Sequence, residues 1–554
     1  MKIVSINNVT NQICLRSFFK RNITMDRYAK SLLSLILMLP VFANGADAGN
    51  TIVVPEKENV GAAALPAGIA PVDEAPFKLK KIRRPEFPDR RETVGKADVS
   101  ASGKITPAIN EKIERLSKRG GGTVVVPAGK WYSGRIELKS NVELRLDEGA
   151  VIEFSGEVDD YQPAVFTRHE GVEVMGAGAF IYANGAKNIA LTGKGVIMGP
   201  PMDVPMRKFP NGKSVVENDI DYRMPVKERL CDGKEGRTFY RPKSFSPINC
   251  KNVLVEGVTF ERSLLWNVNP VYCENVIIRG ITVNSTDVPS GDGIDISSCK
   301  NVLIEYSTLN CGDDCFTLKA GRCEDGLRVN RPTENVLIRY CLAKDGHGGI
   351  TCGSETAGGI RRVYLHDCVF YGTRTGFRFK TRRNRGGTVE DITYENIKLV
   401  NVREAFTWDL LGSKMYMGEL ARRYPPLDIT PLTPTVKDIT IRNFIVESAD
   451  RLMTVNGIPE IPCSGVLLEN GSVRTNRIIK TLNDADGLTL RNMEIQATDN
   501  TMVIDDSRNV LFDNVTFYVP DGALNMDIKG SKASGIVIRS NGADVVCKPG
   551  LNKL

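Results

Sequence analysis

A short motif that recurs along the chain constrains the fold more than any other feature of this sequence. It begins with Asn, Asp or Gly and continues with alternating β-branched residues, which predicts a turn followed by a strand. The clearest copies start at Asn252, Asn275, Asn301 and Asn335, altered copies at Arg362, Asp391 and Asp438, and weaker ones at Lys187, Gly465, Gly487, Asn509 and Gly535. From Asn252 onward the steps are 23, 26, 34, 27, 29, 47, 27, 22, 22 and 26 residues. A repeating unit of this size is typical of a solenoid.

A coil of about 22 residues has room for two or three short strands and for no packed helix. We therefore expect an all-β chain folded as a single-stranded right-handed parallel β-helix, with coils stacked at roughly 4.8 Å. The longer steps indicate inserted loops, one of about a dozen residues after Lys319 and one of about twenty between Trp408 and Val436. Loops that interrupt a solenoid usually wall its binding face.

The N-terminus has the pattern of an export signal. Residues 31–42 form an apolar run that follows Arg27 and Lys30, precedes several small residues, and is too short to anchor the chain in a bilayer. Met25 would give a more ordinary signal start than Met1. We predict that residues 1–48 are an upstream extension and a signal peptide, and that the protein is exported to the periplasm or the extracellular medium.

The rest of the chain divides into two regions. Residues 49–105 are rich in Pro, Lys, Arg and Glu without periodicity, which predicts an irregular N-terminal region, and residues 106–550 carry the β-helix. Ile109, Ile113 and Leu116 lie at helical spacing after Thr106, a candidate N-cap. A short helix there would close the open end of the first coil, whose strand edges would otherwise be exposed.

Charge and cysteine content exclude several classes of partner and cofactor. Loss of residues 1–48 removes six cations and two anions and lowers the formal charge from +7 to +3, and no basic run carries interleaved aromatic residues. We therefore expect no nucleic-acid partner and a monomer without a membrane anchor. Five of the thirteen cysteines fall at repeated positions of the motif, which favours columns of buried thiols over disulfides; they are Cys250, Cys273, Cys299, Cys341 and Cys368. Cys311 and Cys315 are the pair best placed for a disulfide. No ligand spacing predicts a zinc site, and we expect no cofactor.

Four polar clusters lie about one repeat apart, at Gly291-Asp292-Gly293, Gly312-Asp313-Asp314, Gly346-His347-Gly348 and Arg378-Phe379-Lys380. Asp313 lies 12 residues past Asn301, and His347 lies 12 past Asn335. They should therefore occupy equivalent places on adjacent coils. Each cluster alone could be an ordinary turn, because Asp-Gly pairs are common turn formers. Together they would place carboxylates, an imidazole and two cations on one face over about 15 Å.

Such a set suits the cleavage of an acidic polysaccharide. Glycoside hydrolysis needs an acid to protonate the leaving oxygen and a base to activate water. Clustered carboxylates supply both, since like charges at close range raise one pKa and leave that group protonated.

These motifs resemble those of family 28 glycoside hydrolases, the polygalacturonases and related pectin hydrolases. The likeness extends over roughly residues 121–400 and includes Lys319-Ala-Gly-Arg322. It implies that Asp313 is the general acid, that Asp292 and Asp314 activate water, and that His347 orients and tunes the acid. It further implies that Arg378 and Lys380 bind a substrate carboxylate, with inversion and no metal.

Two departures concern the sugar. Ser290-Gly291 precedes Asp292 where many polygalacturonases have Asn-Thr, and Asn269 stands where related bacterial sequences often have His. We expect these positions to touch the substrate. The resulting hypothesis is an exported, exo-acting polygalacturonase, with exo action inferred from the inserted loops and the N-terminal extension.

Other functions stay open at this point. A hydrolase or rhamnosidase for the rhamnose-containing parts of pectin would need less help from Arg378 and Lys380. A Ca²⁺-dependent lyase would give unsaturated products and be inhibited by chelators, and a non-catalytic binding solenoid would be insensitive to Asp313→Asn.

Overall fold

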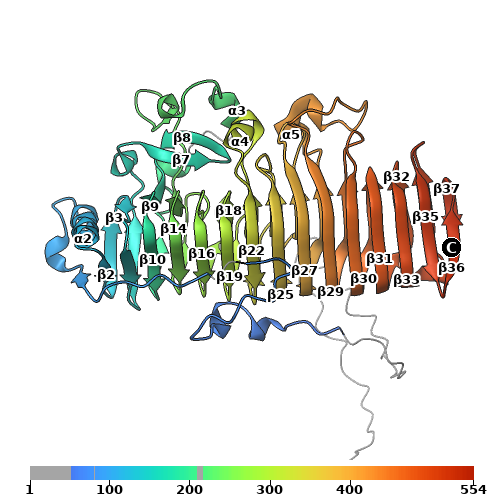
Figure 1. Cartoon of the computed structure of the whole chain (residues 1–554), viewed down its shortest axis with the longest axis horizontal. Helices are drawn as coiled ribbons and strands as arrows, with labels where there is room; N and C mark the ends of the chain where they lie inside the picture. The colour runs from blue at the N-terminus through green and yellow to red at the C-terminus, as the bar shows by residue number, and fades with distance from the viewer. Residues whose placement is uncertain (1–51, 80–81, 209–215) are drawn as a thin grey trace, which may run out of the picture. The chain divides into compact units, whose positions relative to one another are not determined.

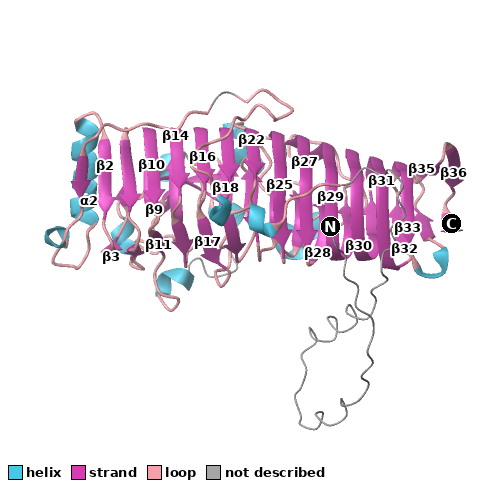
Figure 2. Ribbon diagram, turned by 90° about the horizontal axis from the view of Figure 1, so that it is seen from below, coloured by secondary structure: helices cyan, strands magenta, loops and turns pink. Residues whose placement is uncertain are grey.

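The computed structural model describes residues 52–79, 82–208 and 216–554, and the predicted export signal lies outside them. The part from Ile52 to Leu554 is a parallel β-helix, as predicted from the repeats. Figures 1 and 2 show its coils stacked side by side, with inserted loops on one side and the N-terminal segment along another. No helix within the described ranges is long and apolar enough to cross a membrane.

Each coil contributes strands to three parallel columns. The first contains β2 (Gly122–Val126), β5 (Val142–Leu146), β10 (Lys187–Gly193), β14 (Lys251–Glu256), β16 (Glu274–Arg279), β19 (Lys300–Glu305) and β22 (Thr333–Arg339). The second contains β3 (Gly129–Ser133), β6 (Ala150–Phe154), β11 (Val196–Met198), β15 (Thr259–Glu261), β17 (Thr282–Ser285), β20 (Thr308–Cys311) and β23 (Leu342–Ala343). The third contains β4 (Ile136–Glu137), β9 (Ala179–Asn184), β13 (Lys243–Ile248), β18 (Ile294–Ser297), β21 (Phe316–Lys319), β24 (Gly348–Gly353), β26 (Thr375–Lys380) and β28 (Val402–Asp409).

Towards the C-terminus the strands lengthen and bend through more than one column. These are β25 (Ile360–Tyr371), β27 (Thr388–Val400), β29 (Thr435–Asn456), β30 (Cys463–Asn483), β31 (Ala485–Asp499) and β33 (Arg508–Tyr518). The short strands β32 (Thr501–Asp505), β34 (Asn525–Lys529) and β35 (Ser534–Ser540) each continue a single column. The solenoid ends in two antiparallel strands, β36 (Ala543–Cys547) and β37 (Gly550–Lys553). These strands cover the last edges, which would otherwise be open to pairing.

The residue that opens each repeat adopts a left-handed backbone conformation. Asn252, Asn275, Asn301 and Asn335 have φ of 56–59°, and Gly465 and Gly487 have 62° and 79°. Asn and Gly tolerate this region better than other residues, which explains why they begin the motif. The asparagine amides also form a ladder, since Asn275 Nδ2 donates to Asn252 Oδ1 at 3.0 Å and Asn335 Nδ2 to Asn301 Oδ1 at 3.1 Å. The repeat signature is therefore a backbone requirement joined to a side-chain contact between coils.

The interior of the solenoid is filled by stacked apolar side chains and thiols. Cys250, Cys273 and Cys299 are buried in successive coils, so the predicted column of thiols is confirmed. The proposed disulfide is wrong, because Cys311 and Cys315 are both free thiols. The Sγ of Cys315 instead lies 3.3 Å from the carbonyl oxygen of Asp345 and contacts the turn of the next coil.

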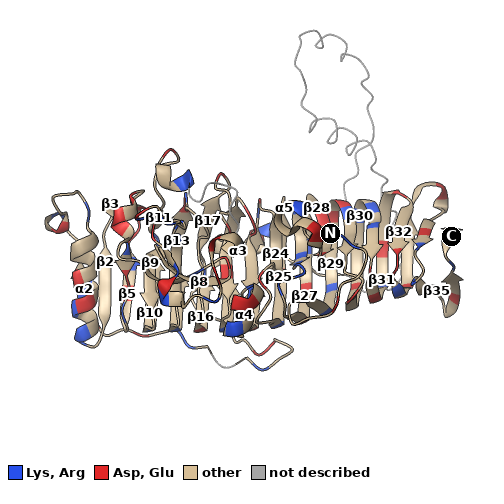
Figure 3. Cartoon of the chain, turned by 90° about the horizontal axis from the view of Figure 1, so that it is seen from above, with Lys and Arg blue, Asp and Glu red and all other residues tan. Residues whose placement is uncertain are grey.

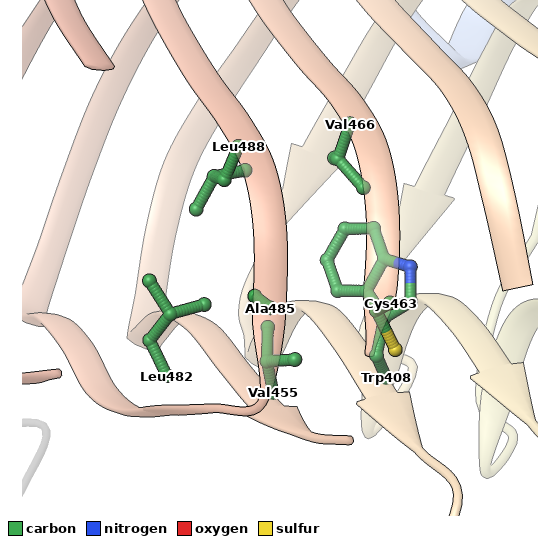
Figure 4. A pocket seen from close by; sticks show the side chains of 7 residues that line it. All are labelled: Trp408, Val455, Cys463, Val466, Leu482, Ala485 and Leu488. Carbon is green, nitrogen blue, oxygen red and sulfur yellow. The ribbon is translucent and has the colours of Figure 1, made fainter. Parts of the chain in front are cut away.

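Within the described residues, a small void lies in this core near the C-terminal coils. Figure 4 shows its apolar lining, which is Trp408, Val455, Cys463, Val466, Leu482, Ala485 and Leu488. Its volume of about 10 Å³ is at the lower limit for one water molecule. Trp408 is thus a core residue.

The N-terminal end is closed by helix α2 (Thr106–Lys118), whose buried face is Ile109, Ile113 and Leu116 as predicted. The predicted cap is wrong. Thr106 is the first helical residue, and its hydroxyl accepts from the Gly134 N–H at 2.6 Å. The side chain therefore ties the helix to the first coil.

The segment before α2 runs along the outside of the solenoid (Figure 2). It contains η1 (Lys57–Asn59), η2 (Ala62–Ala64), β1 (Arg91–Thr93) and η3 (Lys96–Asp98). Arg279 donates to the carbonyls of Pro66 and Gly68, and Arg339 donates to those of Ala70 and Pro71. We call residues 52–79 and 82–90 the strap.

A column of alternating charge lies on the outer face of the first strand column, partly under the strap. Its successive members, from β14 to β35, are Glu256, Arg279, Glu305, Arg339, His366, Glu395, Arg442, Glu469, Arg491, Asp513 and Arg539. Arg279 lies 2.6 Å from Glu256 and 2.8 Å from Glu305, and Arg491 lies 3.0 Å from Asp513. Figure 3 shows charges of both signs along the whole length. Because like charges side by side on a sheet destabilise it, this column helps to fix the register.

Two groups of insertions stand beside the third strand column (Figure 1). The first contains β7 (Val165–His169), β8 (Val172–Gly176), β12 (Leu230–Cys231), α3 (Val216–Asp219) and α4 (Cys323–Val329), and the second α5 (Lys414–Met417) and η7 (Gly418–Ala421). The shorter turns are η4 (Val158–Tyr161), η5 (Pro205–Lys208), η6 (Val226–Glu228) and η8 (Pro520–Gly522). Helix α4 and the α5 region are the two loops predicted from the long repeat steps.

Candidate active site

The third strand column brings the four predicted clusters to one place. The Gly293 N–H donates to the Asp314 carbonyl at 3.0 Å, so Asp292 and Asp314 are near neighbours on adjacent coils. The His347 N–H donates to the Asp313 carbonyl at 2.9 Å, so these two occupy equivalent places, as their equal spacing predicts. Thr351 of β24 pairs with Arg378 of β26, which brings the cations in from the next coil.

Three carboxyl groups meet at this point. Asp292, Asp313 and Asp314 each have an oxygen within 4.8 Å of the other two. Asp292 and Asp314 are buried, whereas Asp313 keeps about a quarter of its side chain exposed. Of the three, Asp313 is the one that a bound sugar can reach directly.

Two cations balance Asp314. Arg378 Nη1 donates to Asp314 Oδ1 at 3.1 Å, and Lys380 Nζ lies 3.6 Å from Oδ2. Burial alone would raise the pKa of Asp314, but Lys380 and Arg378 outweigh it and hold that pKa well below its usual range. Asp314 is therefore an ionised carboxylate at any pH near neutrality.

Asp292 has the opposite electrostatics. Its burial, followed by the negative charges of Asp295 and Asp313, raises its pKa well above the usual value. Among these neighbouring carboxyls, Asp292 is therefore the one whose protonated form is favoured, whereas Asp314 favours its ionised form. The resemblance implies that Asp313 is the acid and Asp292 a base, so Asp292 must lose its proton before it can take one from the attacking water.

His347 contacts the exposed aspartate. Its Nδ1 lies 3.0 Å from Asp313 Oδ1, and this hydrogen bond raises the pKa of the imidazole. Half of the His347 side chain is exposed. A protonated His347 would donate to Asp313 and fix the direction of that carboxyl.

Gly348 leaves room for Asp314. A Cβ at this position would lie 2.6 Å from Asp314 Oδ1 and 2.4 Å from Thr351 Oγ1. The glycines beside the polar clusters are thus more than turn formers, since at least this one clears space for a catalytic candidate.

A second row of buried charges lies next to the aspartates, and the sequence did not single it out as a site. Lys319 Nζ lies 3.6 Å from Asp295 Oδ1 and 3.2 Å from Glu355 Oε2, and Glu355 Oε1 lies 3.2 Å from Arg322 Nη2. The ammonium of Lys319 also lies over the Trp266 ring, 4.6 Å from its centroid. One signal could have found Asp295, since it lies three residues after Asp292 at the start of the next strand.

Asn269 lies beneath the sheet surface and does not reach the substrate side, contrary to expectation. It is fully buried, and its amide donates to the Asp295 carbonyl at 2.7 Å and to Ser297 Oγ at 3.0 Å. It supports the strand that follows Asp292.

Two exposed arginines extend the column that contains Asp313 and His347. The Arg374 N–H donates to the Gly346 carbonyl, and the Arg403 N–H donates to the Arg374 carbonyl at 3.1 Å. Both side chains are exposed, and neither forms an ion pair within the described ranges. Nothing in the sequence pattern singles out Arg403.

The β7–β8 hairpin ends beside the second row of charges. Glu170 at its tip pairs with Arg322 at 3.1 Å. Near this tip the Glu173 N–H donates to Asp325 Oδ2 at 3.0 Å, and the Tyr272 hydroxyl donates to Glu173 Oε1 at 2.9 Å. The hairpin is therefore a fixed wall on the side of the earlier coils.

Comparison with known proteins identifies the same architecture and chemistry. The model of the family "Glycosyl hydrolases family 28" matches residues 117–483. A probable polygalacturonase from Vitis vinifera is 26% identical over 403 residues, which cover 69% of this chain and 74% of that protein. An exo-poly-α-D-galacturonosidase from Dickeya chrysanthemi is 23% identical over 62% of this chain and 60% of that protein.

Among solved structures, the exopolygalacturonase of Thermotoga maritima is similar, with a TM-score of 0.63 and 28% identity over 85% of this chain and 97% of that one. The family 28 exopolygalacturonase of Yersinia enterocolitica has a TM-score of 0.56 at 20% identity, over 82% of this chain and 80% of that one, and supports the fold.

Proposed function

Since this chain belongs to glycoside hydrolase family 28 and is a glycoside hydrolase, we propose that it cleaves α-1,4-galacturonosyl linkages of polygalacturonate from one end of the chain. The observation that supports an acidic substrate is the pairing of Asp314 with Arg378 and Lys380. These two cations keep part of their side chains exposed, so they can also bind a carboxylate of the substrate. A neutral sugar would leave this capacity unused.

In the proposed reaction Asp313 protonates the glycosidic oxygen as the bond to the anomeric carbon breaks. Asp314, with Asp292 once it is ionised, takes a proton from the attacking water. The new C–O bond forms on the opposite face, so the product has inverted configuration. The oxygens of the three aspartates approach within 4.8 Å, closer than the roughly 6.5–9.5 Å common for inverting pairs, which makes product stereochemistry a direct test.

The position of the β7–β8 hairpin supports exo action. A chain of ion pairs, Glu170 to Arg322 to Glu355 to Lys319, joins its tip to the vicinity of Asp292. A wall so near the aspartates leaves little space for sugars on that side. The exo-acting enzymes among the similar proteins agree with the proposed exo action.

The test is product analysis with purified protein on polygalacturonate and, separately, on rhamnogalacturonan. We expect short products from polygalacturonate at the earliest times, in the inverted anomeric form, without unsaturated absorbance and with no effect of EDTA. Early release of long fragments would refute exo action, and retained configuration would refute the single displacement. Activity on rhamnogalacturonan alone would overturn the substrate assignment.

A further inference from the structure

Lys319 is a buried cation that contacts no member of the predicted site directly, yet lies among its charges. It is about 5% exposed and is held between Asp295 and Glu355 over the face of Trp266. Glu355 is equally buried and also pairs with Arg322. Burying such charges costs more free energy than burying apolar residues of the same volume, so the row is a poor device for stability alone.

Asp292 lies three residues before Asp295, the acid that Lys319 contacts at 3.6 Å, so the row lies close to Asp292. Asp295, Asp313 and Asp314 all favour the protonated form of Asp292, and Lys319 is the cation that opposes them. In turn Glu355, followed by Asp295 and Asp292, raises the pKa of Lys319 above its ordinary value, so the ammonium stays charged. Asp292 therefore has one main counter-charge, and Glu355 is the main acid that competes for it.

We propose that Lys319 is a positioning residue that sets the pH at which Asp292 releases its proton, and that Glu355 limits its effect. The inference rests on the proposed function, because it assigns Asp292 to the pair that activates water. The inference adds that residues outside the proposed substrate contacts control the activation of water. The ion-pair chain also ends at Glu170, so the hairpin wall and the ionisation of Asp292 depend on the same charges.

The charged groups that face this region come from every neighbouring element. They are Arg241 before β13, Lys243 of β13, Asp295 of β18, Asp313 and Asp314 before β21, Arg322 after β21, Glu355 after β24, Arg378 and Lys380 of β26, Arg382 and Arg385 after β26, and Arg168, His169 and Glu170 of the hairpin. Burial lowers the pKa of Lys243 to about 7 and raises that of Asp295 to about 7. Lys319 differs from Lys243 in having two acids close to its ammonium, which is why it is the effective cation at neutral pH.

Three variants separate electrostatic control from a merely structural role. Lys319→Met removes the cation, Glu355→Gln removes its competitor, and the double variant removes both. Glu460→Gln is the matched control, since Glu460 is equally buried and paired with Arg383 but lies in another turn. Thermal melts report folding, and the pH profile of kcat/KM on polygalacturonate reports the ionisation of the base.

We expect the acid limb of that profile to move up by about one pH unit in Lys319→Met and down in Glu355→Gln, because a nearby charge shifts a carboxyl pKa by one unit or more. The double variant should return towards the wild-type limb. On the acid side, a one-unit move means about a tenfold loss of kcat/KM. Glu460→Gln should lower the melting temperature and leave the limb in place.

Limbs that stay fixed, or that move in the same direction in both single variants, would overturn the proposal. An infrared titration of the carboxyl bands, with Asp292→Asn to assign the band of Asp292, reads the same ionisation without substrate. It keeps the test valid if Lys319→Met is too unstable for kinetics, because Glu355→Gln must still lower the midpoint. It also separates the two ideas, since an inactive wild-type protein would refute the function while the infrared midpoints still judge Lys319.

Discussion

His347 Nδ1 and Asp313 Oδ1 lie 3.0 Å apart, and this contact couples the imidazole charge to the one exposed aspartate of the site. Asp313 raises the pKa of His347, so the protonated pair is complete at lower pH and is lost as the pH rises through that raised value. We predict an alkaline limb of kcat caused by His347. In His347→Gln the part of that limb caused by the imidazole should be lost, and kcat should fall by about 10²-fold. A pH profile of the variant checks this, and an unchanged alkaline limb would contradict it.

Removal of the ammonium beside Asp314 should weaken both substrate binding and ionisation of that carboxyl. We predict that Lys380→Met lowers kcat/KM on polygalacturonate by about 10²-fold. The matched control is Lys437→Met, which removes an exposed lysine that pairs with Glu390 on the first strand column. Steady-state kinetics of both variants provide the measurement, and equal losses in the two would argue against a specific role.

Shortening the β7–β8 hairpin should open the closed side of the site. We predict that replacement of residues 167–174 by two glycines shifts the early products from short to long fragments and makes the viscosity of polygalacturonate fall faster per bond cleaved. Chromatography of early products and viscometry measure the change. If a variant that melts normally still releases only short products, the hairpin is not the wall.

The exposed arginines beyond His347 should bind carboxylates further along a polymer. We predict that the double variant Arg374→Gln and Arg403→Gln raises KM for polygalacturonate about fivefold, which corresponds to about 1 kcal/mol, and leaves KM for digalacturonate unchanged. Arg91→Gln with Lys548→Gln, two exposed cations outside the site, is the control. The prediction fails if both pairs change KM alike or if the short substrate is affected equally.

Gly348 offers a test of the geometry around Asp314. A methyl group at this position would fall 2.6 Å from Asp314 Oδ1, so Gly348→Ala must displace that carboxylate. We predict a loss of kcat of at least about tenfold, since small displacements of catalytic groups are costly. The melting temperature should fall only slightly. Retention of full activity would mean that the position of Asp314 is not critical.

The repeats predicted the fold and the convergence of the six site residues, because the register between coils determines both. Once Asn301 and Asn335 open equivalent coils, Asp313 and His347 must be neighbours. The role of each carboxyl was less predictable. The high pKa of Asp292 depends on burial and on Asp295, and spacing alone cannot supply either.

The errors came from features that depend on local packing. Thr106 looks like a helix cap in sequence, but its hydroxyl binds the first coil because Gly134 is within reach. Cys311 and Cys315 have the spacing of a pair and lie next to each other in the core, but both are free thiols. Lys319 and Glu355 lie 36 positions apart, and only the stacking of β21 on β24 makes them partners.

The alternating charges from Glu256 to Arg539 limit which insertions and deletions of whole coils the fold can accept. Loss of one interior rung that does not border His366 would put two carboxylates or two guanidiniums next to each other, whereas loss of two consecutive rungs would restore the alternation. His366 is the exception, because it stands between Arg339 and Glu395, which could pair directly in its absence. Away from the histidine rung, insertions and deletions of whole coils should therefore be tolerated in even numbers.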